Sequence, residues 1–203
     1  MDEEEKVFKR DENKIYFGSY YINNKETKEP IEWDILEERD GNALIISHYI
    51  LDTIKFDDQS NNYEKSYIRN WLNNDFYSIA FNDNEKTIIN TTTVDNGLES
   101  IGDRYNIYVC KDTTDKLFLL SYKEVTTYYK TYEERQSTGT NYSGSKGLFV
   151  GSENGYCYWW LRSPRSNRAN YAYCVFCGGL IYNLSVYYTS IGVRPACWIK
   201  IVK

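Results

Sequence analysis

The sequence contains a single histidine, His48, among its 203 residues. Zinc sites built on two or three histidines, including the helical His-Glu-x-x-His motif, are therefore excluded. A Ser-His-Asp or Cys-His relay would have to use this one imidazole, which disfavours such chemistry without excluding it. The scarcity of histidine favours a chain that binds a partner over one that transforms a substrate.

The sequence also lacks a long apolar run, a basic cluster and a secretory leader. No stretch approaches the roughly 20 apolar residues of a transmembrane helix. The chain has 24 Lys and Arg and 29 Asp and Glu, which gives a net charge of −5. It therefore lacks the excess of basic residues that binding to nucleic-acid phosphates requires. The acidic start over residues 1–5 has neither the basic nor the apolar part of a signal peptide. We expect no nucleic-acid partner and no membrane insertion, and a location in the cytoplasm, in a phage particle, or at a surface reached through a removed leader.

The five cysteines form no framework typical of a disulfide-rich domain. Cys174 and Cys177 make a Cys-x-x-Cys, but on an ideal strand residues three apart point to opposite faces. A four-thiolate zinc site would also need Cys157 and either Cys110 or Cys197, and the second Cys-x-x-Cys that makes such sites recognisable is missing. We expect ordinary reduced thiols, no metal and no cofactor.

Hydrophobic periodicity predicts several strands and two principal helices. We expect an α+β fold in which a small twisted antiparallel sheet is flanked by these two helices. A hairpin turn at residues 40–42 joins two of the expected strands, and Ser66 is the expected N-cap of the first helix. The expected strands cover residues 15–22, 30–36, 43–47, 117–121, 156–161 and 191–201, the last interrupted at Pro195. The expected helices cover residues 66–80 and 121–132, and the expected loops 90–106 and 136–147. Residues 1–14 are predicted to be a flexible acidic lead-in.

The composition changes abruptly in the C-terminal quarter. Residues 166–190 contain no Asp, Glu, Lys or Gln, and Arg168 is their one charge. They hold five Tyr, three Asn, three Ser and two Gly. Tyr gives large contact area at low entropic cost, and Ser, Gly and Asn give adaptable hydrogen bonds, so this composition is typical of a binding surface. A pair of aromatic antiparallel strands would also avoid Lys and Glu, and this alternative stays open.

Two short motifs flank this segment. Adjacent Trp159 and Trp160 on a strand face opposite ways, so one fills the core while the other covers a second layer. Arg162 and Arg194 lie within apolar stretches, where an unpaired guanidinium would be costly to desolvate. We therefore assign these two arginines a structural role, in which they hold carboxylates or carbonyls.

The ordered motifs resemble a bacterial domain family of unknown function, over residues 15–203 taken as one domain. The motifs that carry the resemblance are Phe17-Gly18-Ser19-Tyr20, Pro30-Ile31-Glu32-Trp33-Asp34-Ile35-Leu36, Ser66-Tyr67-Ile68-Arg69-Asn70-Trp71-Leu72, Leu119-Leu120-Ser121, Trp159-Trp160-Leu161-Arg162-Ser163-Pro164 and Gly192-Val193-Arg194-Pro195-Ala196. The resemblance implies a C-type-lectin-like fold of the kind shared with formylglycine-generating enzymes. It transfers no catalysis, because Cys174 and Cys177 cannot be placed on the cysteine pattern of those enzymes.

Some domains that this resemblance includes are variable proteins of diversity-generating retroelements, in which adenines of a C-terminal segment are mutated. Such mutation of Asn codons cannot produce Lys, Glu, Gln, Met or Trp, and residues 166–190 contain none of these. The resemblance thus implies a non-catalytic domain that recognises a protein or glycan. The alternatives are a cysteine- and metal-dependent enzyme, or a structural module of a surface or phage assembly. The expected ligand contacts are Asn167, Arg168, Asn170, Tyr171, Tyr173, Phe176, Tyr182, Asn183, Tyr187 and Tyr188.

Overall fold

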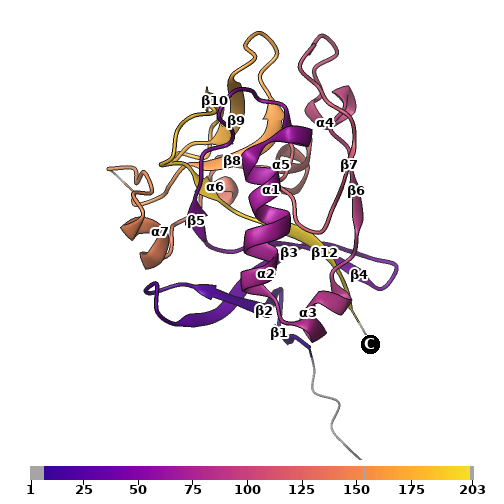
Figure 1. Cartoon of the computed structure of the whole chain (residues 1–203), viewed down its shortest axis with the longest axis vertical. Helices are drawn as coiled ribbons and strands as arrows, with labels where there is room; N and C mark the ends of the chain where they lie inside the picture. The colour runs from indigo at the N-terminus through magenta and orange to yellow at the C-terminus, as the bar shows by residue number, and fades with distance from the viewer. Residues whose placement is uncertain (1–6, 153, 202–203) are drawn as a thin grey trace, which may run out of the picture.

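The computed structural model describes residues 7–152 and 154–201, which form an α+β fold built on two five-stranded sheets. The first sheet has the order β1 (Lys9–Asp11), β2 (Lys14–Tyr21), β3 (Lys28–Arg39), β4 (Asn42–Ser47), β12 (Ala196–Lys200). The second has the order β10 (Ile181–Ser185), β9 (Tyr171–Val175), β8 (Trp159–Pro164), β11 (Gly192–Val193), β5 (Asp52–Thr53). A small third sheet pairs β6 (Thr92–Val94) with β7 (Thr113–Asp115). The first sheet lies at the bottom of Figure 1 and the β8–β10 strands at the top.

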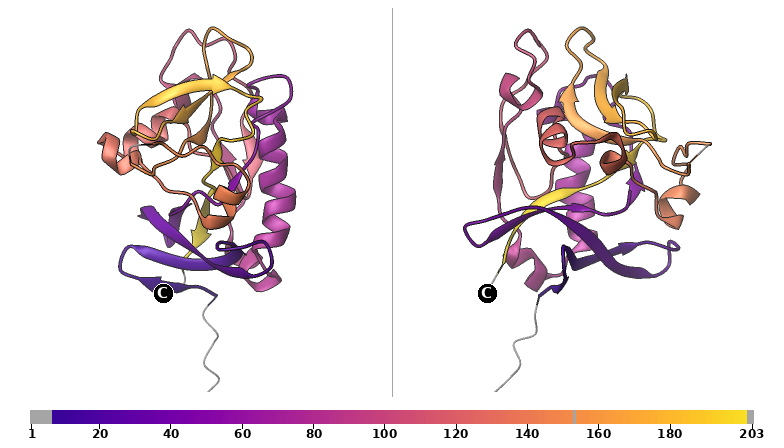
Figure 2. Two further views of the ribbon diagram at one scale, coloured as in Figure 1. Left: turned by 90° about the vertical axis from the view of Figure 1, so that its left-hand side faces the viewer. Right: turned by 180° about the vertical axis from the view of Figure 1, so that it is seen from behind.

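The sheets are more extensive than the single small antiparallel sheet expected from the sequence. β8 and β11 pair in parallel, so the second sheet is mixed. The expected C-terminal strand is divided at Pro195 into β11 and β12, as predicted, and its two parts join different sheets. The chain passes between the two sheets at this proline-containing step and also between β4 and β5. Figure 2 shows the two sheets from two further sides.

The β3–β4 hairpin is confirmed, and its turn follows from local chemistry. Asp40 and Gly41 both have positive φ, which is the backbone that a two-residue hairpin turn with the right twist requires. The predicted flexible lead-in needs correction for the residues described. Lys9–Asp11 form β1 and pair with β2, while residues 1–6 lie outside the described part of the chain.

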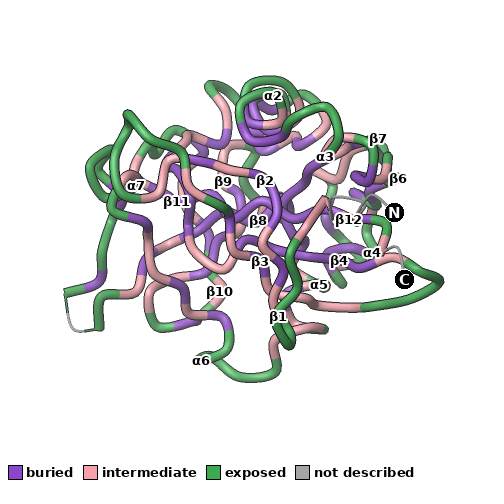
Figure 3. Tube along the Cα trace, turned by 90° about the horizontal axis from the view of Figure 1, so that it is seen from below, coloured by how far each residue is buried: buried purple, intermediate pink, exposed green. Residues whose placement is uncertain are grey.

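The predicted first helix is confirmed as the main helix, residues 67–80, which stands upright in Figure 1. It runs through α1 (Tyr67–Trp71), a π-helical turn η2 (Leu72–Phe76) and α2 (Tyr77–Ala80), after a short 3-10 turn η1 (Tyr63–Lys65). The Ser66 hydroxyl caps it by accepting a hydrogen bond from the backbone N–H of Arg69. In Figure 3 the end of this helix shows an exposed outer side and a buried side that faces the sheets.

The remaining helices are short. They are α3 (Asp83–Ile88), α4 (Leu98–Ile101), α5 (Tyr122–Tyr128), α6 (Tyr132–Arg135) and α7 (Asn141–Ser145). The expected helix over 121–132 ends early, since Tyr129 is extended and caps α5. The expected loops over 90–106 and 136–147 contain β6, α4 and α7. Within the described ranges, no helix combines the length and apolarity needed to cross a membrane.

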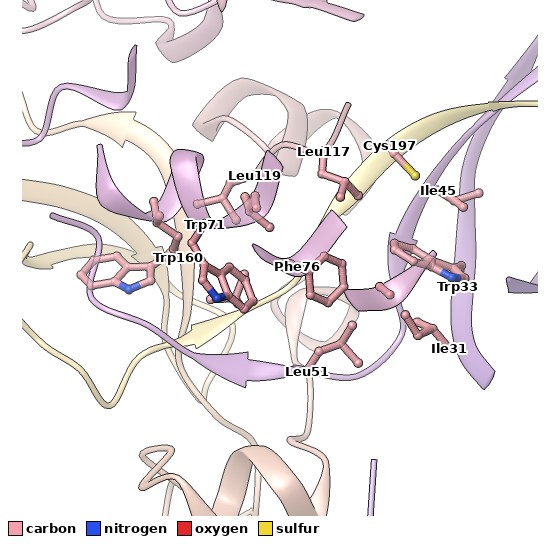
Figure 4. Packing of buried hydrophobic residues seen from close by; sticks show 14 of the residues in the cluster. Ile31, Trp33, Ile45, Leu51, Trp71, Phe76, Leu117, Leu119, Trp160 and Cys197 are labelled. Atoms are coloured by element: carbon pink, nitrogen blue, oxygen red, sulfur yellow. The ribbon is translucent and has the colours of Figure 1, made fainter. Parts of the chain in front are cut away.

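Buried apolar side chains form two clusters, one on each side of the second sheet. The first lies between the main helix and the first sheet, and Figure 4 shows Trp71, Phe76 and Trp33 packed together in it. Trp160 belongs to this first cluster and the adjacent Trp159 to the second, as strand alternation requires. β8 is thus buried on both faces, in agreement with the apolar residues Trp159–Leu161 with which it begins.

The predicted strand over residues 117–121 is wrong as a strand, although its backbone is extended. Only Phe118 makes a bridge, to Ala196, and its neighbours bond to side chains. The Asn73 side chain bonds the backbone of Leu117, and Arg162 takes the carbonyl of Leu119. Hydrogen bonds to side chains thus replace most of the backbone pairing with a neighbouring strand that the apolar run predicted.

Arg162 on β8 is buried beneath α5 with every N–H of its guanidinium bonded. Two parallel hydrogen bonds reach the Glu124 carboxylate, and the others reach the carbonyls of Leu119 and Asp95. Burial raises the pKa of Glu124, but the Arg162 charge and hydrogen bonds outweigh that rise and hold the net pKa below its ordinary value. The pair therefore fixes α5 on the second sheet.

We expect Glu124→Gln to destabilise the fold by about 3 kcal/mol, because it leaves the Arg162 charge buried without a counter-charge. A carboxylate with a depressed pKa contributes stability above its unfolded pKa of about 4.3, and that contribution disappears as pH falls through the folded pKa. Denaturant unfolding, measured from pH 7 to pH 3, should therefore show that acid lowers the free energy of unfolding less in the variant than in wild type. An unchanged free energy of unfolding at pH 7 would contradict this assignment.

Candidate functional site

The segment singled out by its composition folds as the β9–β10 hairpin. Its register is regular, with Asn183 opposite Tyr173 and Tyr182 opposite Cys174. The turn closes through hydrogen bonds between Phe176 and residues 179 and 180. Gly179 has φ +80°, and a Cβ there would lie 1.9 Å from the carbonyl oxygen of Tyr132. Only glycine fits this turn, which packs the hairpin tip against the start of α6.

Nine of the ten expected contact residues keep solvent exposure, and one does not. Exposed residues are Asn167, Arg168, Tyr182, Tyr187 and Tyr188; half-buried residues are Asn170, Tyr171, Tyr173 and Phe176; Asn183 is buried. The hairpin distributes them over two faces, because residues opposite each other in an antiparallel pair share a face. The expected set is therefore not one continuous patch.

Four aromatic rings lie in a row at one face of the hairpin, here called the aromatic row. Phe176 and Tyr182 belong to the hairpin, and Phe149 and Tyr158 come from the chain before β8. Consecutive ring centroids are 4.8, 4.3 and 5.3 Å apart, and the rings of Tyr158 and Phe176 are nearly parallel at 5°. The two ends are about half exposed, Phe149 at 48% and Tyr182 at 51%. The row thus offers an apolar, rigid surface to solvent.

The opposite face packs toward α5 and α6. Tyr173 meets Tyr122 of α5 edge-on at 5.1 Å, and Arg168 lies 4.8 Å above the ring of Tyr171. The pKa of Tyr173 is raised by burial, and the charge of the neighbouring Arg165 opposes that rise. A groove of about 420 Å³ separates the hairpin tip from the two helices. Its lining includes Leu180 and Ile181 from the hairpin and Tyr122, Lys130 and Tyr132 from the other wall.

Asn183 on β10 is only 7% exposed, and its side-chain Nδ2 has no hydrogen-bond partner in the described protein. It lies on the same face as Tyr173 and Ile181, the face that borders the groove. A buried amide donor without an acceptor costs about 1–3 kcal/mol. Among the expected contact residues, Asn183 is the one with a buried polar atom that lacks a hydrogen-bond partner in the described protein.

The tryptophans and the second arginine lie beneath the hairpin. Arg194 is buried, stacks over Trp159 at 4.9 Å and donates from Nε to the carbonyl of Ser47 at 2.9 Å. Its Nη2 lies 3.5 Å from the Asp34 carboxylate. Each indole donates to a backbone carbonyl, Trp159 to Arg135 and Trp160 to Ile54. These hydrogen bonds fix the layer on which the hairpin lies.

The two cysteines of the Cys-x-x-Cys occupy different environments. Cys174 is buried in the first cluster, and burial raises the pKa of its thiol well above the ordinary value. Cys177 lies in the hairpin turn, half-buried, with its Sγ 2.8 Å from where a Cβ on Gly151 would be. Among the described residues, no three His, Cys, Asp or Glu side chains cluster as a metal site requires. His48 bonds through Nδ1 to Asp34 at 2.8 Å.

The sequence reasoning missed Phe149 and Tyr158, two of the four members of the aromatic row. Tyr158 is one residue outside the Trp-Trp motif, and its ring meets Phe176 because β8 and β9 are neighbours. Phe149 follows a polar loop, where an apolar Leu-Phe-Val run was the available signal. The groove was also missed, because it depends on how α6 approaches Gly179.

The described residues thus define an α+β domain with two five-stranded sheets and an aromatic hairpin on its surface. The chain belongs to a family described as a domain of unknown function, DUF6273, whose model matches residues 40–201. The match begins in the β3–β4 turn, so it contains the hairpin, the groove and the aromatic row, whereas β1–β3 precede it. Searches for similar curated proteins and for similar solved structures found no match.

We expect thiol alkylation of the folded protein to modify Cys177 at least about a hundredfold faster than Cys174, because a buried thiol reacts only after the structure opens. Peptide mass spectrometry after timed quenching would measure both rates. Cys197, equally buried, serves as the internal control. Equal rates for Cys174 and Cys177 would contradict the described packing of β9.

Proposed function

We propose that the chain is a non-catalytic binding domain that recognises a protein or glycan target through the β9–β10 hairpin. The observation that carries this proposal is the aromatic row, because four neighbouring rings with half-exposed ends, of which Tyr158 and Phe176 are stacked, form a pre-organised apolar surface. Aromatic side chains of this kind dominate binding energies in protein interfaces. Stacking also reduces the rotamer entropy that is lost on binding.

The surroundings of the row support a recognition role. The loop with Tyr187 and Tyr188, both about half exposed, follows β10 directly. The backbone N–H of Phe149 bonds the carbonyl of Ser190 at 2.9 Å, which brings the end of this loop to the row. Together these residues add exposed phenol rings and hydroxyls beside an apolar centre, the composition of an adaptable binding surface.

The proposal includes a C-type-lectin-like fold and a diversified surface. The resemblance of the motifs supports both, and residues 166–190 hold only residue types that adenine mutation of Asn codons can produce or leave in place. The genome that encodes the chain should then carry a near-copy of this segment beside a reverse transcriptase gene. If the genome lacks such a pair, the proposal that the segment is diversified is wrong, and the binding proposal is unaffected.

The cysteine-dependent enzyme is the weaker alternative. Cys174 is inaccessible, and its raised pKa keeps the thiol protonated at neutral pH. A chain that serves only as a structural module would need none of the exposed aromatic rings. We therefore retain target recognition as the proposed function.

We expect the double substitution Phe149→Ala/Tyr182→Ala to weaken target binding by at least about tenfold, because it removes both exposed ends of the row. Wild-type and variant chains would be compared on arrays of surface proteins and of glycans, and the hits quantified by biolayer interferometry. Tyr105→Ala is the matched control, since Tyr105 is 88% exposed but lies between α4 and β7. Hits that survive the double substitution, or their complete absence, would overturn the proposal.

A further inference from the structure

β10 forms one edge of the second sheet, and β9 is its only neighbouring strand among the described residues. Phe176 bonds Leu180, and Val186 bonds Asn170, so residues 180, 182, 184 and 186 make the ladder with β9. By antiparallel alternation, the N–H and C=O groups of Ile181, Asn183 and Ser185 point away from β9. Outside the β9–β10 ladder, neither Ile181 nor Asn183 makes a backbone hydrogen bond to another described residue.

This edge lacks the features that normally prevent a strand from pairing with another chain. Proteins protect exposed edges with charged residues, proline or bulges. β1, one of the two edges of the first sheet, follows that rule with Lys9, Arg10 and Asp11, all exposed. β10 reads Ile-Tyr-Asn-Leu-Ser, without charge or proline, and its pairing with β9 has no bulge. The contrast with β1 indicates that the β10 edge serves to pair with another chain.

The side-chain amide of Asn183 adds a second, independent observation. Its Nδ2 is buried and has no acceptor in the described protein, and it lies at the middle of the unprotected edge. A strand added alongside β10 would bring backbone carbonyls and cross-strand side chains within about 5 Å of this position. The missing acceptor is therefore of the kind that an added strand supplies.

The charges around the edge favour one kind of occupant. At the hairpin tip, the groove is lined by Lys130 and Arg135 and by one acidic residue, Glu133. Toward the other end of β10, Arg165 and Arg168 lie near Tyr173 and Tyr171, and Asp103 is the acidic group near Tyr173. Cations therefore outnumber carboxylates at both ends, and Lys130, Arg165 and Arg168 make no salt bridge within the described ranges. The edge between them is neutral, so an extended segment with an uncharged centre and acidic flanks is complementary to it.

We propose that an extended peptide segment of a partner protein, acidic at its ends, adds to β10 as a sixth strand of the second sheet. Its backbone pairs with the outward N–H and C=O groups of Ile181 and Asn183 and with the outward N–H of Ser185, whose C=O already accepts from the N–H of Tyr188. One of its acceptors takes the Nδ2 donor of Asn183, and an apolar side chain enters the groove beside Ile181. This inference rests on the proposed function and names its partner class.

Selection of linear peptides of about 12 residues from a phage-displayed library on the full chain tests this proposal, since such peptides exceed the usual strand length of about 5–6 residues. We expect enriched peptides to carry Asp or Glu around a β-prone centre. Their affinity should fall as salt rises from about 0.05 to 0.5 M, because screening weakens the contribution of the three cations. Fluorescence anisotropy would give the dissociation constants.

Ser185→Pro removes one outward N–H and leaves the ladder with β9 intact, so the variant should fold and bind enriched peptides at least about tenfold more weakly. Ser185→Ala is the matched control and should bind like wild type. Asn183→Ala keeps its backbone N–H and should weaken binding only through the loss of the side-chain Nδ2 donor. Thermal unfolding by circular dichroism would check that each variant is folded.

Three results would overturn the added strand. No enriched peptide would do so, as would enriched peptides that bind the folded Ser185→Pro variant like wild type. A concentration-dependent dimer in sedimentation velocity that Ser185→Pro abolishes, without enriched peptides, would assign the edge to a second copy of the chain. Loss of array hits in the Phe149→Ala/Tyr182→Ala variant would still support the binding function in all three cases.

Discussion

The hydrogen bonding of one buried guanidinium sets the position of the second sheet. Arg162 sits at the centre of the domain, where its charge is tolerated only if every N–H is bonded and a carboxylate lies opposite. The hydrogen-bond partners of Arg162 come from α5, the 117–121 segment and the loop after β6, so these three segments pack on β8. These three segments cover one side of the strand next to the hairpin. The surface above them depends on this arrangement.

The alternation of side chains between the two faces of the second sheet also positions the candidate site. Trp159 and Trp160 place a cluster on each side of β8, and β9 and β10 continue the two faces at the edge of the sheet. One face ends in the aromatic row and the other in the groove beside α5 and α6. The two surfaces are therefore consequences of one register, in which a shift by one residue would exchange them.

Much of this could be read from the sequence, and the rest could not for identifiable reasons. The β3–β4 hairpin, the Ser66 cap and the division at Pro195 follow from local chemistry, so pattern and turn residues predict them. The composition of residues 166–190 located the hairpin, yet it placed Asn183 among surface contacts although tertiary packing buries it. The apolar run at 117–121 resembled a strand because its carbonyl and amide partners, Arg162 and Asn73, are distant in sequence. Phe149 enters the aromatic row only through contacts that no local pattern records.

The hairpin lies on a frame of buried residues that is separate from the exposed surface. The buried residues that hold it, Arg162, Arg194 and the two tryptophans, lie outside the segment 166–190. Exposed positions such as Tyr182 and Tyr187 contribute little to that frame, and surface substitutions typically change stability by only about 0.5 kcal/mol. Change in the exposed residues is thus separated from folding, a separation that a diversified binding surface requires. Backbone pairing at β10 is less sensitive still to side-chain identity, because its donors and acceptors belong to the main chain.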